Sequence, residues 1–172
     1  MAKNNIYLWT GEGAGKTTSA LGVALRCAGH GLKVIVIQFM KGRKNIGEYK
    51  IMEKLKPYYK VYQFGSPSFI RPINKPSKND KELAAKGLEF AGKAAKKKPR
   101  LLILDEINLA CAIGLVKTDD VIDLVKRCSK YTIVYLTGRK APSKLKQIAD
   151  FVNEIRPVKA PKKYPVRKGI EF

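Results

Sequence analysis

The sequence predicts a single α/β domain in which a parallel β-sheet carries helices on both faces. Three observations lead to this prediction. Strand-like and helix-like segments alternate along the whole chain, as they do around parallel sheets. The run VIVI at 34–37 is β-branched throughout, which is typical of a strand buried on both faces. The segment TGEGAGKTT at 10–18 joins an apolar run to a helical segment through a turn rich in glycine.

Six runs rich in apolar residues have the length and composition of strands. In chain order they are residues 6–9, 34–37, 59–64, 101–104, 132–136 and 152–155. The carboxyl ends of parallel strands meet at one edge of a sheet, where ligands bind in such folds. The polar residues that follow these runs are therefore the candidates for a functional site.

Five segments between the strands are predicted to be helices, at residues 17–28, 48–55, 79–97, 118–128 and 143–151. Gly29 marks the end of the first helix. Asn79 and Asp80 open the third, and Thr118 and Asp119 are expected to cap the fourth.

Two long segments are predicted to be irregular. Residues 41–47 form a loop, and residues 65–78 carry three prolines and a glycine, which argues against a regular element. The tail from Arg156 also carries three prolines and several lysines, so we expect it to be extended. We therefore predict an α/β domain at 1–158 and a basic tail at 159–172 that belongs to the same domain.

The composition is that of a globular protein with a strong positive charge. The 172 residues fit one domain, 45% of them are hydrophobic, and 35 Lys+Arg against 14 Asp+Glu give a net charge of +21. Such a surplus favours polyanions such as nucleotide phosphates or nucleic acid, although a highly soluble surface would account for it equally well. Basic and aromatic residues do not alternate as in single-strand binding proteins, so nucleic acid is not the expected partner.

The cysteines and the N-terminus indicate a cytoplasmic protein. Cys27, Cys111 and Cys128 lie in apolar or helical surroundings, and no pair has the spacing of metal ligands. Buried, reduced cysteines in the cytoplasm are the simplest account. The N-terminus enters a strand directly without a signal peptide, and no apolar run reaches transmembrane length, so we expect no membrane association.

The segment TGEGAGKTT predicts a phosphate-binding loop. Gly11, Gly13 and Gly15 let the backbone curl so that its N–H groups can point at phosphate oxygens. Lys16 can reach the outer phosphates, and the Thr17 hydroxyl can bind Mg²⁺. The positive end of the following helix faces the same anion. With the alternation of strands and helices, this loop predicts a P-loop NTPase-type, RecA-like fold.

The loop is a variant, and a turn without a ligand is the alternative. Thr10 stands where the usual pattern has a glycine, five residues before Gly15. Glu12, Ala14 and Thr18 complete the loop, and we include them among the candidate nucleotide-binding residues. Because Gly15, Lys16 and Thr17 occur together between a strand and a helix, we favour the phosphate-binding interpretation.

A second candidate site follows the run LLIL at 101–104, which ends in Asp105 and Glu106. We expect this strand to lie beside the first strand, so that its carboxylates can bind Mg²⁺ directly or through water, or orient a nucleophile. Adjacent strand residues point to opposite faces, so one of the two faces the metal, and the sequence leaves open which. A solvated acidic pair is the alternative.

Several segments together resemble the phosphate-loop class of cobalamin (corrinoid) adenosyltransferases. They are TGEGAGKTT at 10–18, ALGVALR at 20–26, GHG at 29–31, VIQFMKG at 36–42, GE at 47–48, LDEIN at 104–108, LTGR at 136–139, RPVK at 156–159 and GIEF at 169–172. The resemblance covers nearly the whole chain in order. The QFxKG, RPVK and terminal GIEF segments are the most specific, since phosphate loops occur in many families.

The resemblance implies transfer of the 5′-deoxyadenosyl group of ATP to cob(I)alamin or a related corrinoid. In that family Co(I) attacks the 5′ carbon of ATP, triphosphate leaves whole, and ATP is bound in reverse relative to other P-loop enzymes. Lys16 and Thr17 with Mg²⁺ would neutralise the leaving triphosphate, and Glu106 or Asp105 would complete the metal site. The resemblance also implies a homodimer and a reductase or flavin donor that supplies the Co(I).

Three weaker candidates and three departures follow from the same resemblance. Arg26 and Gln38 are candidates for nucleotide contacts, with a helix-surface charge as the alternative for Arg26. Glu12 and Ala14 replace an Asn and a Lys common in the family's loop, which makes this loop less cationic. Phe69 is a candidate for corrinoid contact, or it simply packs the loop, where the family often has both a Phe and a Trp. The segment VRK at 166–168 replaces the family's usual Ala-Gln before the last glycine.

A nucleic-acid-stimulated P-loop ATPase or nucleotide-binding module is the alternative function, supported by the charge of +21 together with the loop. The product distinguishes the two hypotheses. The adenosyltransferase releases triphosphate, whereas an ATPase releases ADP and phosphate.

Overall fold

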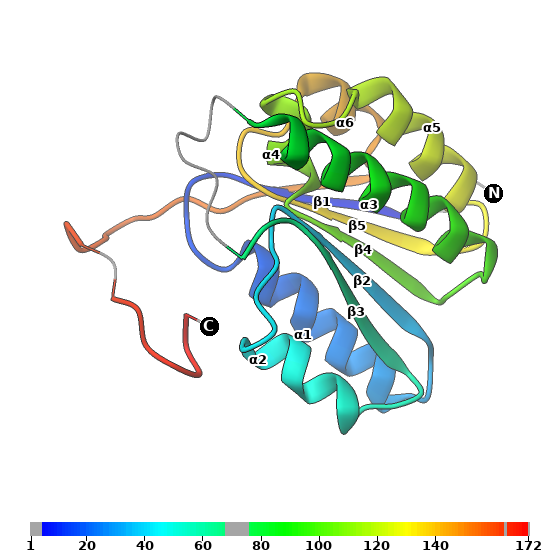
Figure 1. Ribbon diagram of the computed structural model, residues 1–172, viewed down its shortest axis with the longest axis horizontal. Coiled ribbons are helices and arrows are strands. Elements are labelled where there is room, and N and C mark those ends of the chain that lie inside the picture. The colour runs from blue at the N-terminus through cyan, green and yellow to red at the C-terminus, as the bar shows by residue number, and fades with distance from the viewer. Residues whose placement is uncertain (1–4, 68–75, 164, 172) are drawn as a thin grey trace.

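A computed structural model describes residues 5–67, 76–163 and 165–171. Six parallel strands form one sheet in the order β3-β2-β4-β5-β1-β6 (Figure 1). The strands are β1 (Ile6–Thr10), β2 (Val34–Phe39), β3 (Tyr59–Phe64), β4 (Leu101–Asp105), β5 (Ile133–Thr137) and β6 (Phe151–Glu154). The predicted α/β fold with a parallel sheet is confirmed.

Helices cover both faces of this sheet (Figure 1). The helical elements are α1 (Lys16–Gly29), α2 (Gly47–Lys50), the 3-10 helix η1 (Ile51–Glu53), α3 (Lys78–Lys96), α4 (Ile107–Ala112), α5 (Thr118–Cys128) and α6 (Ser143–Ile148). Helices α1 and α2 lie on one face, and α3, α4, α5 and α6 lie on the other (Figure 1). Each face has its own hydrophobic core.

The two cores are built from different residues. On the α1 face, Ala20, Ala24 and Ala28 recur every four residues and are buried, so small side chains let α1 lie close to the sheet. The opposite core is larger and includes Leu and Ile from the strands with Val121 and Leu145 from α5 and α6. All residues of β2 and β4 are buried, as predicted for β2 from its β-branched run.

The predicted position of β4 beside β1 is wrong. Strand β5 lies between them: β1 pairs with β5 and β6, while β4 pairs with β2 and β5. Strand order depends on how the connections cross the sheet, and a run of apolar residues carries no information about its neighbours. The loop after β1 and the carboxylates after β4 still reach one another, because parallel strands end at the same edge.

Other element boundaries also differ from the prediction. Helix α4 was not predicted; it follows Glu106 directly and has no side-chain hydrogen bond at its N-cap. Helix α6 ends at Ile148, three residues early, because the chain extends into β6 from Phe151. Helix α3 is capped by Ser77, whose hydroxyl and backbone N–H form a reciprocal capping box with Asp80. Helix α5 has Lys117 rather than Thr118 at its N-cap.

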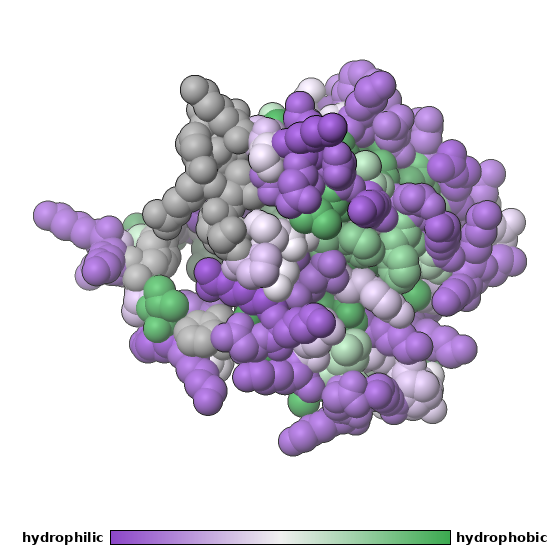
Figure 2. All heavy atoms as spheres, in the orientation of Figure 1, coloured by the Kyte–Doolittle hydropathy of each residue, from purple (hydrophilic) through white to green (hydrophobic). Residues whose placement is uncertain are grey.

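The surface is strongly hydrophilic on the face that Figure 2 shows.

Of the three cysteines, Cys111 and Cys128 are buried and Cys27 is partly buried, and all three are free. Burial raises the pKa of the Cys111 thiol to about 12 and that of Cys128 to about 11, which keeps both thiols protonated. Within the described ranges, no helix combines the length and the apolar character needed to span a bilayer.

Candidate functional site

The loop between β1 and α1 has the predicted strand–turn–helix form. β1 ends at Thr10 and α1 begins at Lys16, with Gly15 at its N-cap in a left-handed conformation, φ 109°. A side chain at Gly15 would be strained there, so glycine is required at this turn. The 14-residue helix therefore points its N-terminus, with its unpaired N–H groups, at the space above the loop.

The segment after β6 supports this loop from outside. The Gly13 N–H donates to the Ile155 carbonyl at 2.8 Å, and the Ile155 N–H donates to the Thr10 carbonyl at 2.9 Å. A Cβ on Gly13 would lie 2.7 Å from the Ile155 side chain, and one on Gly11 would overlap the Ile155 carbonyl. These two glycines are therefore needed for close approach to Ile155. The Gly13 N–H, expected to face phosphate, is used inside the protein.

Lys16 folds back over the loop. Its side chain is buried, with the residue 7% exposed, and its ammonium group donates a hydrogen bond to the Gly13 carbonyl. Burial, followed by the charge of Arg139, lowers the pKa of Lys16, while Glu106 and Glu12 act in the opposite direction. The Lys16 ammonium group thus lies at the loop, near the positive charge of Arg139 and the negative charges of Glu106 and Glu12.

The centre of the site is the carboxylate of Asp105, which is fully buried and accepts four hydrogen bonds. Oδ1 accepts from the Thr17 hydroxyl at 2.8 Å and from the Thr137 hydroxyl at 2.6 Å. Oδ2 accepts from the Lys41 ammonium at 2.8 Å and from the Gln38 amide at 3.1 Å. We call these five residues the Asp105 cluster. It joins the ends of β2, β4 and β5 to the start of α1.

Strand register explains why these residues meet. Gln38 on β2 pairs with Asp105 on β4 in the parallel ladder, and Leu104 pairs with Leu136, the residue before Thr137. Three polar side chains at the carboxyl ends of adjacent strands are therefore placed side by side. Thr17 reaches them from the first turn of α1, which packs against β4 and β5.

Glu106 differs from Asp105 although the two are adjacent. Its backbone is left-handed, φ 62° and ψ 13°, and its N–H donates to the Thr137 hydroxyl at 3.1 Å. Burial and the nearby Asp105 carboxylate raise the pKa of Glu106, against the opposing charges of Lys41, Lys16 and Arg139. For Asp105, burial acts the same way, but Lys41 and the donated hydrogen bonds outweigh it and lower the pKa.

A second ring of hydrogen bonds holds the cluster in place. The Gln38 amide also donates to Glu48 at 3.2 Å, and Gln63 donates to the Gln38 side-chain oxygen at 3.0 Å. Beyond β4, the Asn108 amide donates to the carbonyl of Trp9 at 3.1 Å and to that of Gly138 at 3.2 Å. The Asn108 contacts tie the end of β1, the start of α4 and the segment after β5 together, next to the cluster.

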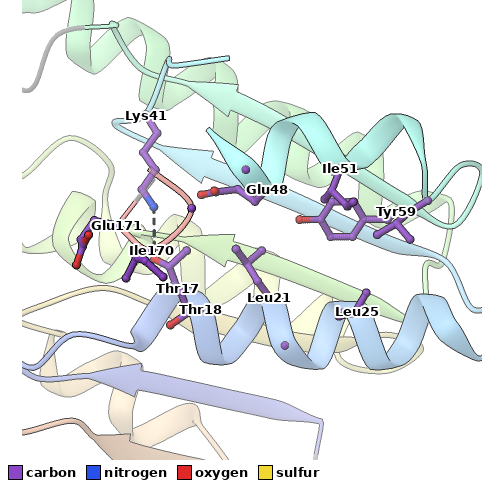
Figure 3. A pocket seen from close by; sticks show the side chains of 14 residues that line it. Thr17, Thr18, Leu21, Leu25, Lys41, Glu48, Ile51, Tyr59, Ile170 and Glu171 are labelled. Atoms are coloured by element: carbon purple, nitrogen blue, oxygen red, sulfur yellow. Dashed lines mark hydrogen bonds between the residues drawn. The ribbon is translucent and has the colours of Figure 1, made fainter. Parts of the chain in front are cut away.

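A cavity of about 530 Å³ opens beside the cluster on the α1 face. Figure 3 shows Lys41, Thr17 and Thr18 at one end of it, with Leu21 and Leu25 of α1 along one side. Its other lining residues come from α2, η1, β3 and the C-terminal tail and include Glu48, Ile51, Leu55, Tyr59, Ile170 and Glu171. The cavity is thus charged at the loop end and apolar along its length, and the tail forms part of its wall.

The structure brings most of the predicted site residues together. Lys16, Thr17, Gln38, Asp105 and Glu106 surround the start of α1, as the preceding contacts show. The remaining loop residues lie at the rim. Glu12 is half-exposed and pairs with Arg139 at 2.9 Å, Ala14 is exposed, and the Thr18 hydroxyl donates to the Gly15 carbonyl at 3.2 Å.

Two predicted residues lie elsewhere. Arg26 is exposed near the C-terminal end of α1, where its charge acts on Tyr135 of β5 rather than on the Asp105 cluster. Phe69, the candidate for corrinoid contact, lies outside the described residues.

Sequence reasoning missed Lys41 as a member of the site and gave Thr137 no role in it. Thr137 directly follows the predicted strand at 132–136, so the rule that polar residues at strand ends form the site includes it, whereas Lys41 lies four residues beyond the predicted strand at 34–37. Lys41 was assigned to a loop at 41–47, and the structure instead places it against a buried carboxylate.

Comparison with known proteins gives a consistent result. A family model described as ATP:corrinoid adenosyltransferase BtuR/CobO/CobP matches residues 2–172. A corrinoid adenosyltransferase from Sinorhizobium sp is 30% identical over an alignment of 181 positions, which covers 99% of this chain and 81% of the relative. Corrinoid adenosyltransferase CobA from Salmonella typhimurium (strain LT2) is 32% identical over 156 residues, covering 90% and 77%. The matched region includes every residue of the Asp105 cluster.

Proposed function

The chain belongs to the ATP:corrinoid adenosyltransferase family, and from this premise we propose how its own residues hold the reactants. As a member of that family it is a transferase acting on ATP and a corrinoid. We propose that the triphosphate of ATP lies over the Thr10–Thr18 loop. The observation that carries this proposal is the convergence of Lys16, Thr17 and the Asp105 carboxylate at the N-terminus of α1.

In the proposed reaction, the Co(I) of the reduced corrinoid attacks the 5′ carbon of ATP. The cobalt–carbon bond forms as the bond from C5′ to the α-phosphate oxygen breaks, and its electron pair leaves with triphosphate. The protein then needs no nucleophile of its own. Its task is to align the reactants and to neutralise the charge that develops on the leaving group.

We assign that neutralisation to Lys16 and to the N-terminus of α1. The Lys16 ammonium exchanges its hydrogen bond with the Gly13 carbonyl for a phosphate oxygen, which needs only a side-chain rotation. The free N–H groups of the first turn of α1 face the same anion. The apolar cavity beside Thr17 and Thr18 is where we expect the adenosyl end and the corrinoid to approach each other.

Mg²⁺ suits the oxygen atoms that this site offers. They are the Thr17 hydroxyl and the carboxylates of Asp105 and Glu106, and Mg²⁺ typically combines one or two carboxylates with substrate phosphates and water. The described residues hold no group of three or more His, Cys, Asp or Glu placed to bind a metal without such help. When bound, Mg²⁺ would neutralise the triphosphate. Because Asp105 already accepts four hydrogen bonds, we assign metal contact to Glu106 and orientation of Thr17 to Asp105.

The alternative, a nucleic-acid-stimulated ATPase, is not favoured by the family match. Four expectations stay predictions: a homodimer, a reductase or flavin donor for Co(I), a cytoplasmic location, and the division into a domain at 1–158 with a tail at 159–172. The corrinoid contact expected of Phe69 also stays a prediction.

Product identity tests the proposal directly. The purified protein is mixed with chemically reduced cobalamin, ATP and Mg²⁺, and adenosylcobalamin is followed by its visible spectrum and the phosphate product by ³¹P NMR. We expect triphosphate in equal amount to adenosylcobalamin. Lys16→Ala should lower turnover by about 100-fold, the scale of removing one stabilising charge from a transition state. Lys86→Ala, an exposed lysine on α3, is the matched control. ADP and phosphate as products would overturn the proposal.

A further inference from the structure

Lys41 lies where the metal of the proposed function would lie. Its ammonium group is 2.8 Å from Asp105 Oδ2 and donates to the Thr17 hydroxyl oxygen at 3.4 Å. The Thr17 hydroxyl oxygen is a proposed Mg²⁺ ligand, and Asp105, which orients it, is the carboxylate whose charge faces this position. In Figure 3 the Lys41 side chain reaches down to Thr17 at the charged end of the cavity. A cation therefore already occupies this position, supplied by the protein.

The backbone holds Lys41 in this place. Met40, just before it, has a left-handed backbone, φ 57°, and its N–H donates to the Phe64 carbonyl at 3.0 Å. The loops after β2 and β3 then cross so closely that a Cβ on Gly65 would lie 2.6 Å from the Met40 Cα atom. A side chain on Gly42 would likewise overlap the backbone of Ser66, at 2.8 Å. A left-handed turn and two glycines thus aim Lys41 at the cluster.

The charge of Asp105 explains why the position needs a cation. The Asp105 side chain is 1% exposed, and a buried carboxylate is unstable without a counter-charge. Lys41 provides that charge while its own side chain keeps 29% of its surface exposed, toward the cavity. A divalent ion in the same place would lie next to the ammonium group, and like charges at that distance repel strongly. Both cations cannot occupy the position together.

We propose that Lys41 is a displaceable counter-ion, which occupies the metal position in the nucleotide-free protein and is expelled when the metal arrives with ATP. The expelled ammonium group turns into the cavity that its side chain already borders. There it stays beside the triphosphate, next to Thr17 and Thr18. The metal alone binds weakly, because it must break the buried ion pair between Lys41 and Asp105. When the metal binds together with ATP, the phosphates offer the expelled ammonium group a new counter-charge. This inference depends on the proposed function for the identity of the site.

Binding of Mn²⁺ to the nucleotide-free protein, measured by electron paramagnetic resonance, tests this inference. Lys41→Met keeps an unbranched side chain one atom shorter and removes the charge. We expect it to lower the dissociation constant for Mn²⁺ alone by at least about 10-fold, since a repelling charge is removed at close range. Lys44→Met, an exposed lysine of the same loop, controls for the change in net charge and should leave the constant unchanged. The double variant Lys41→Met with Asp105→Asn should lose the tighter Mn²⁺ binding of Lys41→Met, because the carboxylate charge is also removed.

Equal or weaker Mn²⁺ binding by Lys41→Met would overturn the proposal. Lys41→Gln, which keeps a hydrogen-bond donor for Asp105, replaces it if Lys41→Met fails to fold by circular dichroism. If neither variant folds, the wild type decides: Mn²⁺ must bind at least about 10-fold more tightly with a non-hydrolysable ATP analogue than alone, and equal affinity contradicts the displacement. No corrinoid is present in these assays, so a failed adenosyltransferase assay and a failed displacement are separate results.

Discussion

Asp105 and Glu106 are adjacent carboxylates that lie in two different regions of the site. Asp105 ends β4 inside the cluster, where four donors surround it and its pKa is lowered. Glu106 lies one residue later in a left-handed turn, facing Lys16 and Arg139, and its pKa is raised. One carboxylate organises the protein, while in the proposed function the next one is left to bind the metal. Surroundings, rather than residue type, divide the two roles.

The turn at Glu106 produces this division. A non-glycine residue with a left-handed backbone costs about 1–3 kcal/mol, so the surrounding structure must hold it there. The hydrogen bond from the Glu106 N–H to Thr137 does so, and Thr137 in turn donates to Asp105. If the chain continued as a strand, the two side chains would point to opposite faces of the sheet. The turn instead leaves both at the same edge.

The largest expected effect is on stability, from Asp105→Asn. This change leaves the Lys41 ammonium without its counter-charge and weakens the bonds to Thr17 and Thr137. Removal of one partner of a buried pair typically costs about 3–5 kcal/mol, and we expect a loss of this size in the free energy of unfolding, measured by urea denaturation. Asp119→Asn, which breaks only the exposed pair with Lys144, is the control and should cause no measurable change. An equal loss of unfolding free energy in the two variants would mean that Asp105 does not stabilise the fold more than an exposed ion pair does.

The next effect is on catalysis, from Glu106→Gln. We expect the fold to persist and turnover to fall by about 100-fold, because a charge that acts on the metal and triphosphate is lost. Glu154→Gln on the exposed edge strand β6 is the control and should retain full turnover. A Glu106→Gln variant as active as the control would remove Glu106 from the metal site and transfer that role to Asp105.

The pH dependence of stability separates the two carboxylates further. Since the pKa of Glu106 is raised in the folded protein, the folded chain binds more protons than the unfolded chain between the two pKa values, and its stability falls as pH rises through that window. Glu106→Gln should therefore gain stability over the wild type as pH rises from that of an ordinary Glu, and the gain should then level off. Asp105 acts oppositely: its lowered pKa adds stability that is lost as pH falls through that lowered value. Urea denaturation from acid to neutral pH measures both trends.

The smallest effect is expected at the rim, from Glu12→Gln. Glu12 and Arg139 are both about half-exposed, so their ion pair is screened by solvent. Removing the Glu12 charge frees Arg139 to face the phosphates, and we expect the KM for ATP to fall by less than about fivefold. The decrease should shrink as salt is added. A larger change, or one independent of salt, would mean that the rim is as tightly organised as the Asp105 cluster.

Local patterns predicted the elements that carry the site. The glycines, Lys16 and Thr17 identified the loop, and the apolar run before Asp105 identified its strand, because both signals lie within a few adjacent residues. The position of β5 between β1 and β4 could not be predicted, since strand order follows from crossovers that residue types do not record. Helix α4 was not predicted because it is short and has no capping side chain.

The role of Lys41 also required the structure. Its placement depends on the left-handed turn at Met40 and on Gly65, 24 residues away from Lys41 in the sequence. A lysine in a loop of a protein with 35 basic residues carries no local sign of such a contact. The same holds for the Gly13 N–H, which is used by Ile155 from the far end of the chain.

Trp9 gives the molecule a built-in optical reporter. It is the chain's single tryptophan, it directly precedes Thr10, and its carbonyl accepts the Asn108 bond that joins the loop to α4. Light absorbed at the red edge of the protein spectrum excites this indole almost alone, so the emission comes from one known point beside the Thr10–Thr18 loop. If ATP binds over this loop as proposed, we expect the surroundings of that indole to change. Stopped-flow fluorescence can therefore follow the arrival of ATP in real time, in the unlabelled wild-type protein and before any corrinoid is added.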